Sequence, residues 1–147
     1  MTGTQTLEAL IDYIEDVFFT RVTRILADES KALDRCEKIF LLLLGFCEKN
    51  PGLTRILTGE GLAGETERLR KRVIRLFERL ETQLKQLLRE AEIKEGLRTK
   101  MTVGTTANLL LAAAEGRIVQ YVRSEFKRQP TDGWAEQWLY LSDVIFK

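Results

Sequence analysis

Residues 48–59 read Glu48-Lys49-Asn50-Pro51-Gly52-Leu53-Thr54-Arg55-Ile56-Leu57-Thr58-Gly59, and this segment interrupts an otherwise helical sequence. Pro51 lacks a backbone N–H and disfavours helical angles at the residue before it, so the apolar helix that runs through Leu41–Leu44 must end near Asn50. Gly52 is expected to allow the turn, and Leu53 to Thr58 read as one short helical piece. The segment therefore predicts a long helix, a turn and a short helix.

Helical periodicity continues on both sides of this break. Apolar residues recur at helical spacing and predict long helices at about Thr6–Ala27, Lys31–Lys49, Glu65–Glu92 and Thr102–Phe126, followed by a final helix that carries Trp134 and Trp138. Asp28-Glu29-Ser30 is expected to end the first helix and cap the second, and Thr131 or Asp132 to cap the last. Ile93 to Met101 reads as a loop that is broken at Gly96. The expected fold class is all-α.

Length and composition are those of one helical domain. The chain has 147 residues, of which 31% are charged and 44% hydrophobic, with only two prolines. Its 23 basic and 22 acidic residues leave a net charge of +1, so no overall field draws it to nucleic acid. No apolar run is long enough to cross a bilayer, and Met1-Thr2-Gly3-Thr4-Gln5 does not resemble the start of a signal peptide. The expected location is the cytoplasm.

The sequence offers little catalytic chemistry. It contains no histidine, which removes the commonest general base and the usual nucleophile pairs. Cys36 and Cys47 share one expected helix, and a rise of about 1.5 Å per residue separates them by roughly 16 Å, so they are expected to pack rather than to form a disulfide or bind zinc. Gly59, Gly61 and Gly64 match a GxGxxG pattern, but without a preceding strand they read as a linker. We expect neither an enzyme nor a cofactor or metal.

A run of basic residues in the third long helix is also expected to have a structural rather than a functional role. Arg68, Arg70, Lys71, Arg72 and Arg75 alternate with glutamates, so ordinary ion pairing on a helix surface is expected rather than phosphate binding.

Two short patterns on the first two helices could face each other across a cleft. Tyr13, Val17 and Arg21 repeat every four residues, and Leu42, Gly45 and Lys49 also share one helical face. Gly45 costs about 1 kcal/mol relative to alanine within a helix, which indicates a close approach to the backbone there. Either close packing within the chain or a bound partner could explain the glycine. The residues alone favour close packing.

The helix from Thr102 to Phe126 is apolar on nearly every side and therefore needs several packing partners. The last helix adds its tryptophans to this apolar surface. We expect a homodimer on these grounds, with an interface formed by Leu110, Leu111, Ala114, Ile118, Trp134 and Trp138.

Several segments resemble one known family. The segments are residues 48–59, Leu10-Ile11-Asp12-Tyr13-Ile14-Glu15-Asp16, Leu76-Phe77-Glu78-Arg79, and Arg123-Ser124-Glu125-Phe126-Lys127 with Pro130-Thr131-Asp132. They are similar to the SlmA-type nucleoid occlusion factors, a branch of the TetR family of helix-turn-helix transcriptional regulators, and they cover nearly the whole chain. The resemblance implies a TetR-type C-terminal helical domain that dimerises through its last two long helices as an intermolecular four-helix bundle.

The resemblance also implies a partner. SlmA-like proteins bind the extended C-terminal tail of the division protein FtsZ between the first two helices of this domain, which transfers the cleft to Tyr13, Arg21, Leu42, Gly45, Lys49 and Asn50. The family usually has Phe in place of Tyr13 and Arg in place of Lys49, and the second difference removes a bidentate donor.

Residues 1–147 are expected to form only the regulatory domain, because the similarity starts near Leu7 and leaves no room for the family's DNA-binding module. An engineered fragment and a natural truncation would look the same in the sequence. In the full-length family that module binds specific chromosomal DNA and places the protein at the nucleoid, so specific DNA binding is not expected of this chain.

The expected function is to dimerise and to bind FtsZ, which antagonises assembly of the division ring over the chromosome. The alternative is the small-molecule-sensing, dimerising domain of an ordinary TetR repressor, whose ligand would lie among the first, second and third long helices. An adaptor without any ligand is a third possibility.

Overall fold

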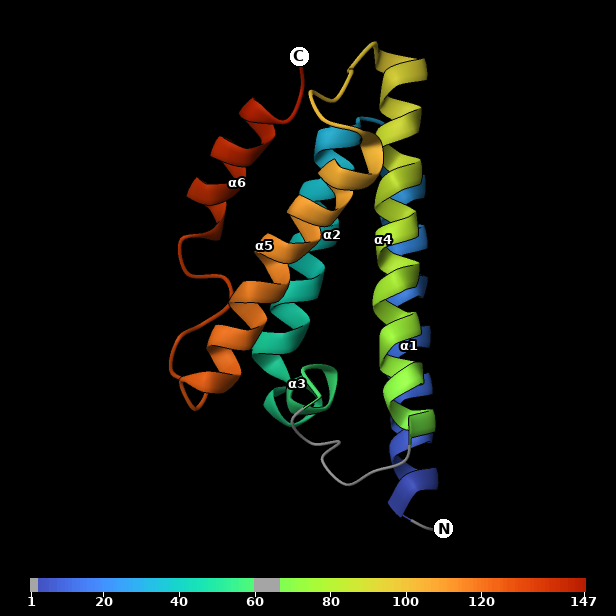
Figure 1. The fold of residues 1–147 in the computed structure, drawn as a ribbon, viewed down its shortest axis with the longest axis vertical. Coiled ribbons are helices and arrows are strands. Elements are labelled where there is room, and N and C mark those ends of the chain that lie inside the picture. Colours follow the sequence, from blue (N-terminus) through green and yellow to red (C-terminus); the bar gives the residue numbers. More distant parts are fainter. Residues whose placement is uncertain (1–2, 60–66) are drawn as a thin grey trace.

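The computed structural model describes residues 3–59 and 67–147 (Figure 1). Its regular elements in this part are helices: α1 (Gly3–Asp28), α2 (Ala32–Lys49), α3 (Pro51–Leu57), α4 (Glu67–Glu95), α5 (Val103–Arg123) and α6 (Trp134–Val144). One isolated antiparallel bridge joins Thr99 and Phe146. The all-α prediction is confirmed. None of the helices described combines the length and the apolarity that crossing a bilayer requires.

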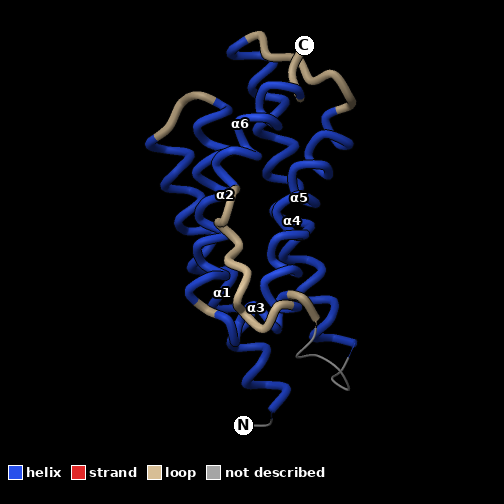
Figure 2. The backbone as a smooth tube through the Cα atoms, turned by 90° about the vertical axis from the view of Figure 1, so that its left-hand side faces the viewer, coloured by secondary structure: helices blue, strands red, loops and turns tan. Residues whose placement is uncertain are grey.

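The four long helices form two layers. One layer is made by α1 and α2 and the other by α4 and α5, as the side view in Figure 2 shows. Helix α2 packs against α1, α4 and α5, while α3 lies at one end of the bundle. The short α6 covers α2 from outside, where Trp134 and Trp138 place their rings 5.7 and 5.8 Å from that of Phe40.

The core follows the apolar periodicity of the sequence. Leu69, Val73, Leu76, Leu80, Leu84 and Leu87, the predicted stripe of α4, are all buried. Helix α2 buries Cys36, Ile39, Phe40, Leu43, Leu44 and Cys47 because it has neighbours on several sides. The space between α1, α2 and α4 is filled by buried residues such as Ile14, Phe18 and Leu76. These packed side chains occupy the region in which the alternative interpretation expects a small-molecule ligand.

The break between α2 and α3 falls at Asn50, as predicted, but glycine does not make the turn. Asn50 leaves the helical region with φ −132° and ψ 68°, and Pro51 begins α3. Gly52 lies inside α3, so the role expected for it is wrong. Buried Thr54 fixes the junction, because its single hydroxyl proton is shared between the carbonyls of Cys47 and Asn50, at 2.9 and 2.8 Å from Oγ1.

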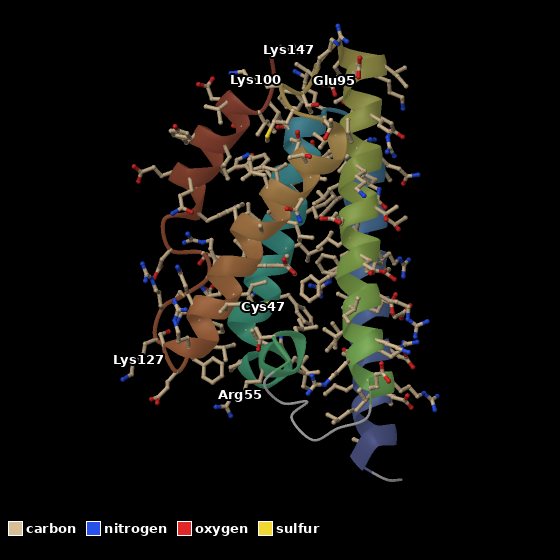
Figure 3. The ribbon with its side chains drawn as sticks, in the orientation of Figure 1. Cys47, Arg55, Glu95, Lys100, Lys127 and Lys147 are labelled. Carbon is tan, nitrogen blue, oxygen red and sulfur yellow. The ribbon has the colours of Figure 1, made fainter. Side chains whose placement is uncertain are left out.

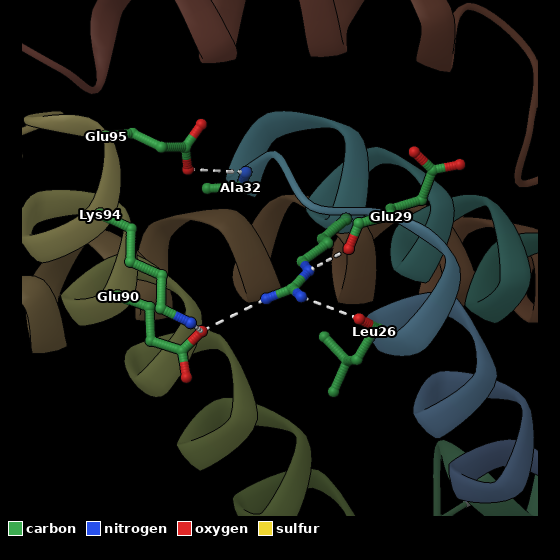
Figure 4. Close-up of polar contacts among 7 residues, drawn as sticks. Leu26, Glu29, Ala32, Glu90, Lys94 and Glu95 are labelled. Atoms are coloured by element: carbon green, nitrogen blue, oxygen red, sulfur yellow. Dashed lines mark hydrogen bonds and ion pairs between the residues drawn. The ribbon is translucent and has the colours of Figure 1, made fainter.

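At the opposite end of the bundle, the N-terminus of α2 is capped from a distant helix. The backbone N–H of Ala32 donates to Oε2 of Glu95 at 3.0 Å (Figure 4). The N-cap residue Lys31 makes no side-chain cap bond, so the expected capping by residues 28–30 is wrong. Arg35 of α2 connects this end of the helix to α1 and α4. It donates hydrogen bonds to the carbonyls of Leu26 and Glu29 and forms an ion pair with Glu90.

Helix α4 continues beyond its expected C-terminal end near Glu92. It ends at Glu95, inside the expected loop, and Gly96 terminates it with a φ of +68°, a conformation that favours glycine. The N–H of Leu97 then donates to the carbonyl of Ala91 at 3.1 Å, which completes the cap. Gly96 is the predicted break.

The C-terminal segment returns to the same end of the molecule. The N–H groups of Lys100 and Lys147 donate to the carbonyls of Ile145 and Arg98 at 2.9 and 2.8 Å. Figure 3 shows Glu95, Lys100 and Lys147 together at this end, with Arg55 and Lys127 at the other. The N-cap of α6 is Gly133 rather than the expected Thr131 or Asp132.

Helices α1 and α4 are joined by ion pairs. Arg68 pairs with Glu8 at 2.6 Å, Arg72 with Asp12 and Glu15, and Arg79 with Glu15 at 3.0 Å. Lys71 pairs with Glu67 within α4 at 3.8 Å. Arg68, Lys71 and Arg72 of the basic run thus form ordinary ion pairs as predicted, although most of these pairs join two helices.

Candidate functional site

A groove lies between α1 and α2 and ends at the α2–α3 junction. Its volume is about 380 Å³. Its walls are formed by Tyr13, Val17, Arg21, Leu41, Leu42, Gly45, Phe46, Lys49, Asn50 and Leu53. All six residues that the sequence assigned to a partner cleft are among them. The structure therefore brings the two helical patterns together on one surface.

Gly45 lies on α2 in the wall of this groove. A Cβ atom added there would meet no other atom within 4 Å, apart from its own helix. Close packing within the chain, which the residues alone favoured, is therefore wrong at this position. The glycine instead leaves open space beside the backbone of α2 at this point.

The walls combine apolar surface with positive charge. Tyr13 is 61% exposed and Leu41 44% exposed, so both present apolar surface to an incoming partner. Among the residues described, Arg21 and Lys49 are the only charged ones in the lining, and no carboxylate belongs to it. In residues 3–59 and 67–147, neither cation forms an ion pair within the chain. A partner with apolar and acidic side chains would complement both features.

Hydrogen bonds fix the C-terminal end of α2, which carries Lys49 and is followed by Asn50. The carbonyl of Glu48 accepts a hydrogen bond from Tyr121 Oη at 2.8 Å, and its Oε1 accepts one from Thr131 at 2.7 Å. Burial, and then the negative charge of Glu48, raise the pKa of Tyr121, so this donor stays protonated. Asn50 Nδ2 donates to the carbonyl of Phe46 at 2.8 Å.

Sequence reasoning missed part of the apolar wall. Leu41, Phe46 and Leu53 line the groove but were not assigned to it. Phe46 lies four residues after Leu42, so helical spacing could have found it. Leu53 could not be found in this way, because its position depends on the angle between α2 and α3.

Other chemical groups of the chain are not arranged for catalysis. Both cysteines are buried with free thiols, as their predicted packing role requires. Burial raises the pKa of Cys36 to about 12 and that of Cys47 to about 11, so neither forms a thiolate at neutral pH. Within the described residues no acidic, histidine or cysteine side chains form a group of three that could hold a metal ion. Of the GxGxxG pattern, Gly61 and Gly64 lie outside the described residues.

The six residues expected at a dimer interface lie inside the single chain. Leu110, Leu111, Ala114, Ile118, Trp134 and Trp138 are at most 4% exposed. They pack α5 and α6 against the rest of the bundle, so they have no surface to offer a second chain. The apolar surface that remains exposed belongs to other residues of these helices: Leu109 and Val119 on α5, and Leu139, Tyr140 and Val144 on α6.

The fold matches that of known regulators. The solved structure of the transcriptional regulator FadR from Bacillus subtilis, in complex with stearoyl-CoA, superposes with a TM-score of 0.70 over 90% of this chain and 72% of that chain. Sequence identity is 13%, so this likeness shows the fold alone. The fold is that of the helical C-terminal domain of TetR-type regulators.

The sequence places the chain within one branch of this class. Residues 30–145 match the family model SlmA-like_C, described as the tetracycline-repressor-like C-terminal domain, and the chain belongs to this family. The nucleoid occlusion factor SlmA of Marinomonas sp. is 54% identical over 138 residues, which cover 94% of this chain and 70% of that protein. The SlmA protein of Shewanella amazonensis is 51% identical over 140 residues, 95% of this chain and 71% of the relative.

Proposed function

We propose that this chain is the regulatory domain of a nucleoid occlusion factor and that it binds the extended, partly acidic C-terminal tail of FtsZ in the groove between α1 and α2. Binding would counteract assembly of the division ring over the chromosome. Membership of the SlmA-like family supports the cellular role. The composition of the groove supports the chemistry of the partner.

The observation that carries the proposal is that two cationic side chains without ion-pair partners line the same groove as a glycine with open space beside it. Arg21 and Lys49 lie on opposite helices of a groove without carboxylates, and Gly45 leaves space beside the backbone of α2. An extended peptide can place its main chain along Gly45, its apolar side chains against Tyr13 and Leu42, and its carboxylates near the two cations. Oppositely charged surfaces of this kind determine specificity and the rate of association.

The expected affinity is modest. Exposed ion pairs contribute only about 0.2 to 1 kcal/mol each, and salt screens them. Replacement of one cation by Glu turns attraction into repulsion and should weaken binding by about threefold to tenfold. Binding should also weaken as the salt concentration rises.

The test is calorimetric titration of the domain with a synthetic FtsZ tail peptide, together with amide chemical-shift mapping. Arg21→Glu and Lys49→Glu should each weaken binding, and the wild-type shifts should centre on the groove. Arg89→Glu on the outer face of α4 and Lys127→Glu beyond α5 are the matched controls, because both residues are exposed and lie outside the groove.

The controls should bind like the wild type. The groove assignment is wrong if all four variants weaken binding equally, which would indicate a general charge effect, or if neither groove variant weakens it.

A further inference from the structure

The carbonyl groups at the C-terminal end of α2 find partners outside the helix. A helix end leaves its last carbonyls without hydrogen-bond donors of its own. The carbonyls of Phe46 and Cys47 accept from the side chain and the N–H of Asn50, at 2.8 and 3.2 Å. The carbonyl of Glu48 accepts from Tyr121 Oη at 2.8 Å. Of these donors, only Tyr121 comes from a distant part of the chain, 73 positions from its acceptor, so it connects this end of α2 to α5.

Tyr121 itself lies outside the groove. Its side chain is 3% exposed and is not among the residues that line the groove. The ring of Phe126 packs edge-on against it, with 5.1 Å between the ring centroids. The hydroxyl is thus held beside α2, at the residue that precedes Lys49.

The backbone that follows α5 is strained where it supports Tyr121. Glu125 and Phe126 have φ values of 55° and 65°, in the left-handed region that is unfavourable for residues with a Cβ atom. The N–H of Phe126 donates to the carbonyl of Tyr121 at 2.8 Å, and Arg55 of α3 lies over the Phe126 ring, 5.5 Å from its centroid. Such strain persists where the surrounding contacts require it, and here those contacts converge on Tyr121 and the α2–α3 junction.

Glu48 is also held by its side chain. Its Oε1 accepts from Oγ1 of Thr131, in the connection between α5 and α6, at 2.7 Å. The lining of the groove includes the next residue, Lys49, but not Glu48. A Glu48 carboxylate released from Thr131 would compete for Lys49 and would repel an acidic peptide. The two contacts of Glu48 thus keep this end of the groove cationic.

We propose that Tyr121 is a positioning residue for the peptide in the groove between α1 and α2. Its hydroxyl fixes the last turn of α2, so that Lys49 faces the peptide while Glu48 stays bonded to Thr131. This role of Tyr121 rests on the proposed function, because it concerns the same groove and the same peptide. Tyr121 belongs to neither of the two helical patterns that form the groove, and the peptide does not touch it.

Tyr121→Phe tests this role, because it removes the hydroxyl and keeps the ring that packs on Phe126. In calorimetric titration with the synthetic FtsZ tail peptide, this variant should bind about threefold to tenfold more weakly than the wild type, as expected for one lost hydrogen bond. Glu95→Ala is the matched control. It also removes a hydrogen bond between α2 and a distant residue, but at the N–H of Ala32, away from the groove, so it should bind like the wild type.

Double variants separate positioning from a general loss of structure. Because Tyr121 acts through the end of α2, Tyr121→Phe should lose most of its effect in a Lys49→Ala domain. It should keep its effect in an Arg21→Ala domain, since Arg21 lies on α1. A general loss of structure would weaken binding equally in both backgrounds.

Thr131→Val is an independent test that leaves Tyr121 in place. It releases the Glu48 carboxylate and should weaken peptide binding about threefold. Adding Glu48→Gln should restore binding, because a neutral amide does not compete for Lys49.

The outcomes distinguish this role from the function on which it rests. A wild-type domain that does not bind the peptide would contradict the proposed function and the role of Tyr121 with it. A wild type that binds, beside a Tyr121→Phe domain that binds equally well, would overturn the role of Tyr121 alone. Equal losses in the Lys49→Ala and Arg21→Ala backgrounds, or a Glu95→Ala domain that loses as much affinity, would lead to the same conclusion.

Discussion

Gly45 shows how one residue can separate stability from binding. A glycine inside α2 weakens the helix, yet no neighbouring atom requires it, because a Cβ atom would lie in open space. Selection for packing would not explain it. The peptide groove proposed above would explain it, because a peptide backbone would need the space beside this glycine.

The prediction at this residue uses two replacements. Gly45→Ala should raise the free energy of unfolding by about 1 kcal/mol in urea, because alanine has the higher helix propensity and meets no obstacle. Gly45→Leu should also fold, but its side chain should fill the groove and abolish binding of the FtsZ tail peptide in the same calorimetric titration.

Gly52→Ala is the matched control, since Gly52 lies on α3 outside the groove with equally open space around it. It should leave peptide binding unchanged. A Gly45→Leu domain that folds and binds the peptide as tightly as the wild type would refute the groove assignment.

At the scale of elements, α2 depends on α4 for its N-terminal cap. Glu95→Ala removes the acceptor of the Ala32 N–H and should lower the free energy of unfolding by about 1 kcal/mol, the usual cost of a lost N-cap. Urea unfolding with a constant m-value would measure this change.

Glu92→Ala is the comparison for this cap. Glu92 lies one turn earlier on α4, and its exposed side chain pairs with Arg98 at 3.1 Å, so its loss should cost less than about 0.5 kcal/mol. Equal losses in the two variants would mean that the Glu95 contact contributes no more than a surface charge.

Sequence periodicity was sufficient to predict where the helices are but not where each one begins and ends. The apolar stripe of α4 predicted its buried face correctly, because helical spacing alone decides which residues share a face. The cap of α2 could not be predicted, since its acceptor lies 63 positions away in the chain. Helix boundaries depend on such tertiary contacts.

The groove was predictable for a related reason. Tyr13 and Arg21 on α1, and Leu42, Gly45 and Lys49 on α2, each share one face by spacing, and family resemblance supplied the pairing of the two faces. The prediction that Leu110 and Ala114 of α5 form a dimer interface was wrong. An apolar helix needs packing partners, but these can come from the same chain as well as from a second one. Here the single chain buries Leu110 and Ala114, which the sequence could not distinguish from burial by a second chain.

For the whole molecule, a net charge of +1 conceals two sites of opposite sign. In the described part of the chain, the charged residues that line the groove in the α1–α2 layer, Arg21 and Lys49, are cations. Those that line a cavity in the α4–α5 layer, Glu78, Glu81 and Glu115, are carboxylates. Average charge therefore says little about partners. Each layer presents its own electrostatic surface.

The last prediction is that the domain is a homodimer, with an interface revised to the exposed residues of α5 and α6. Leu139 and Tyr140 are 70% and 69% exposed on α6, and Val119 is 45% exposed on α5. Large apolar side chains that remain exposed are typical of surfaces that a second subunit covers. Sedimentation should give about twice the chain mass of 16.9 kDa.

Leu139→Glu combined with Val119→Glu should produce a folded monomer, because both side chains point away from the core. Ile93→Glu is the control and should remain dimeric, since Ile93 is 83% exposed near the end of α4. Leu110→Glu should instead unfold the domain, because it buries a charge at a site with 0% exposure. A monomeric wild type at micromolar concentration would contradict the prediction, as would a double variant that stays dimeric.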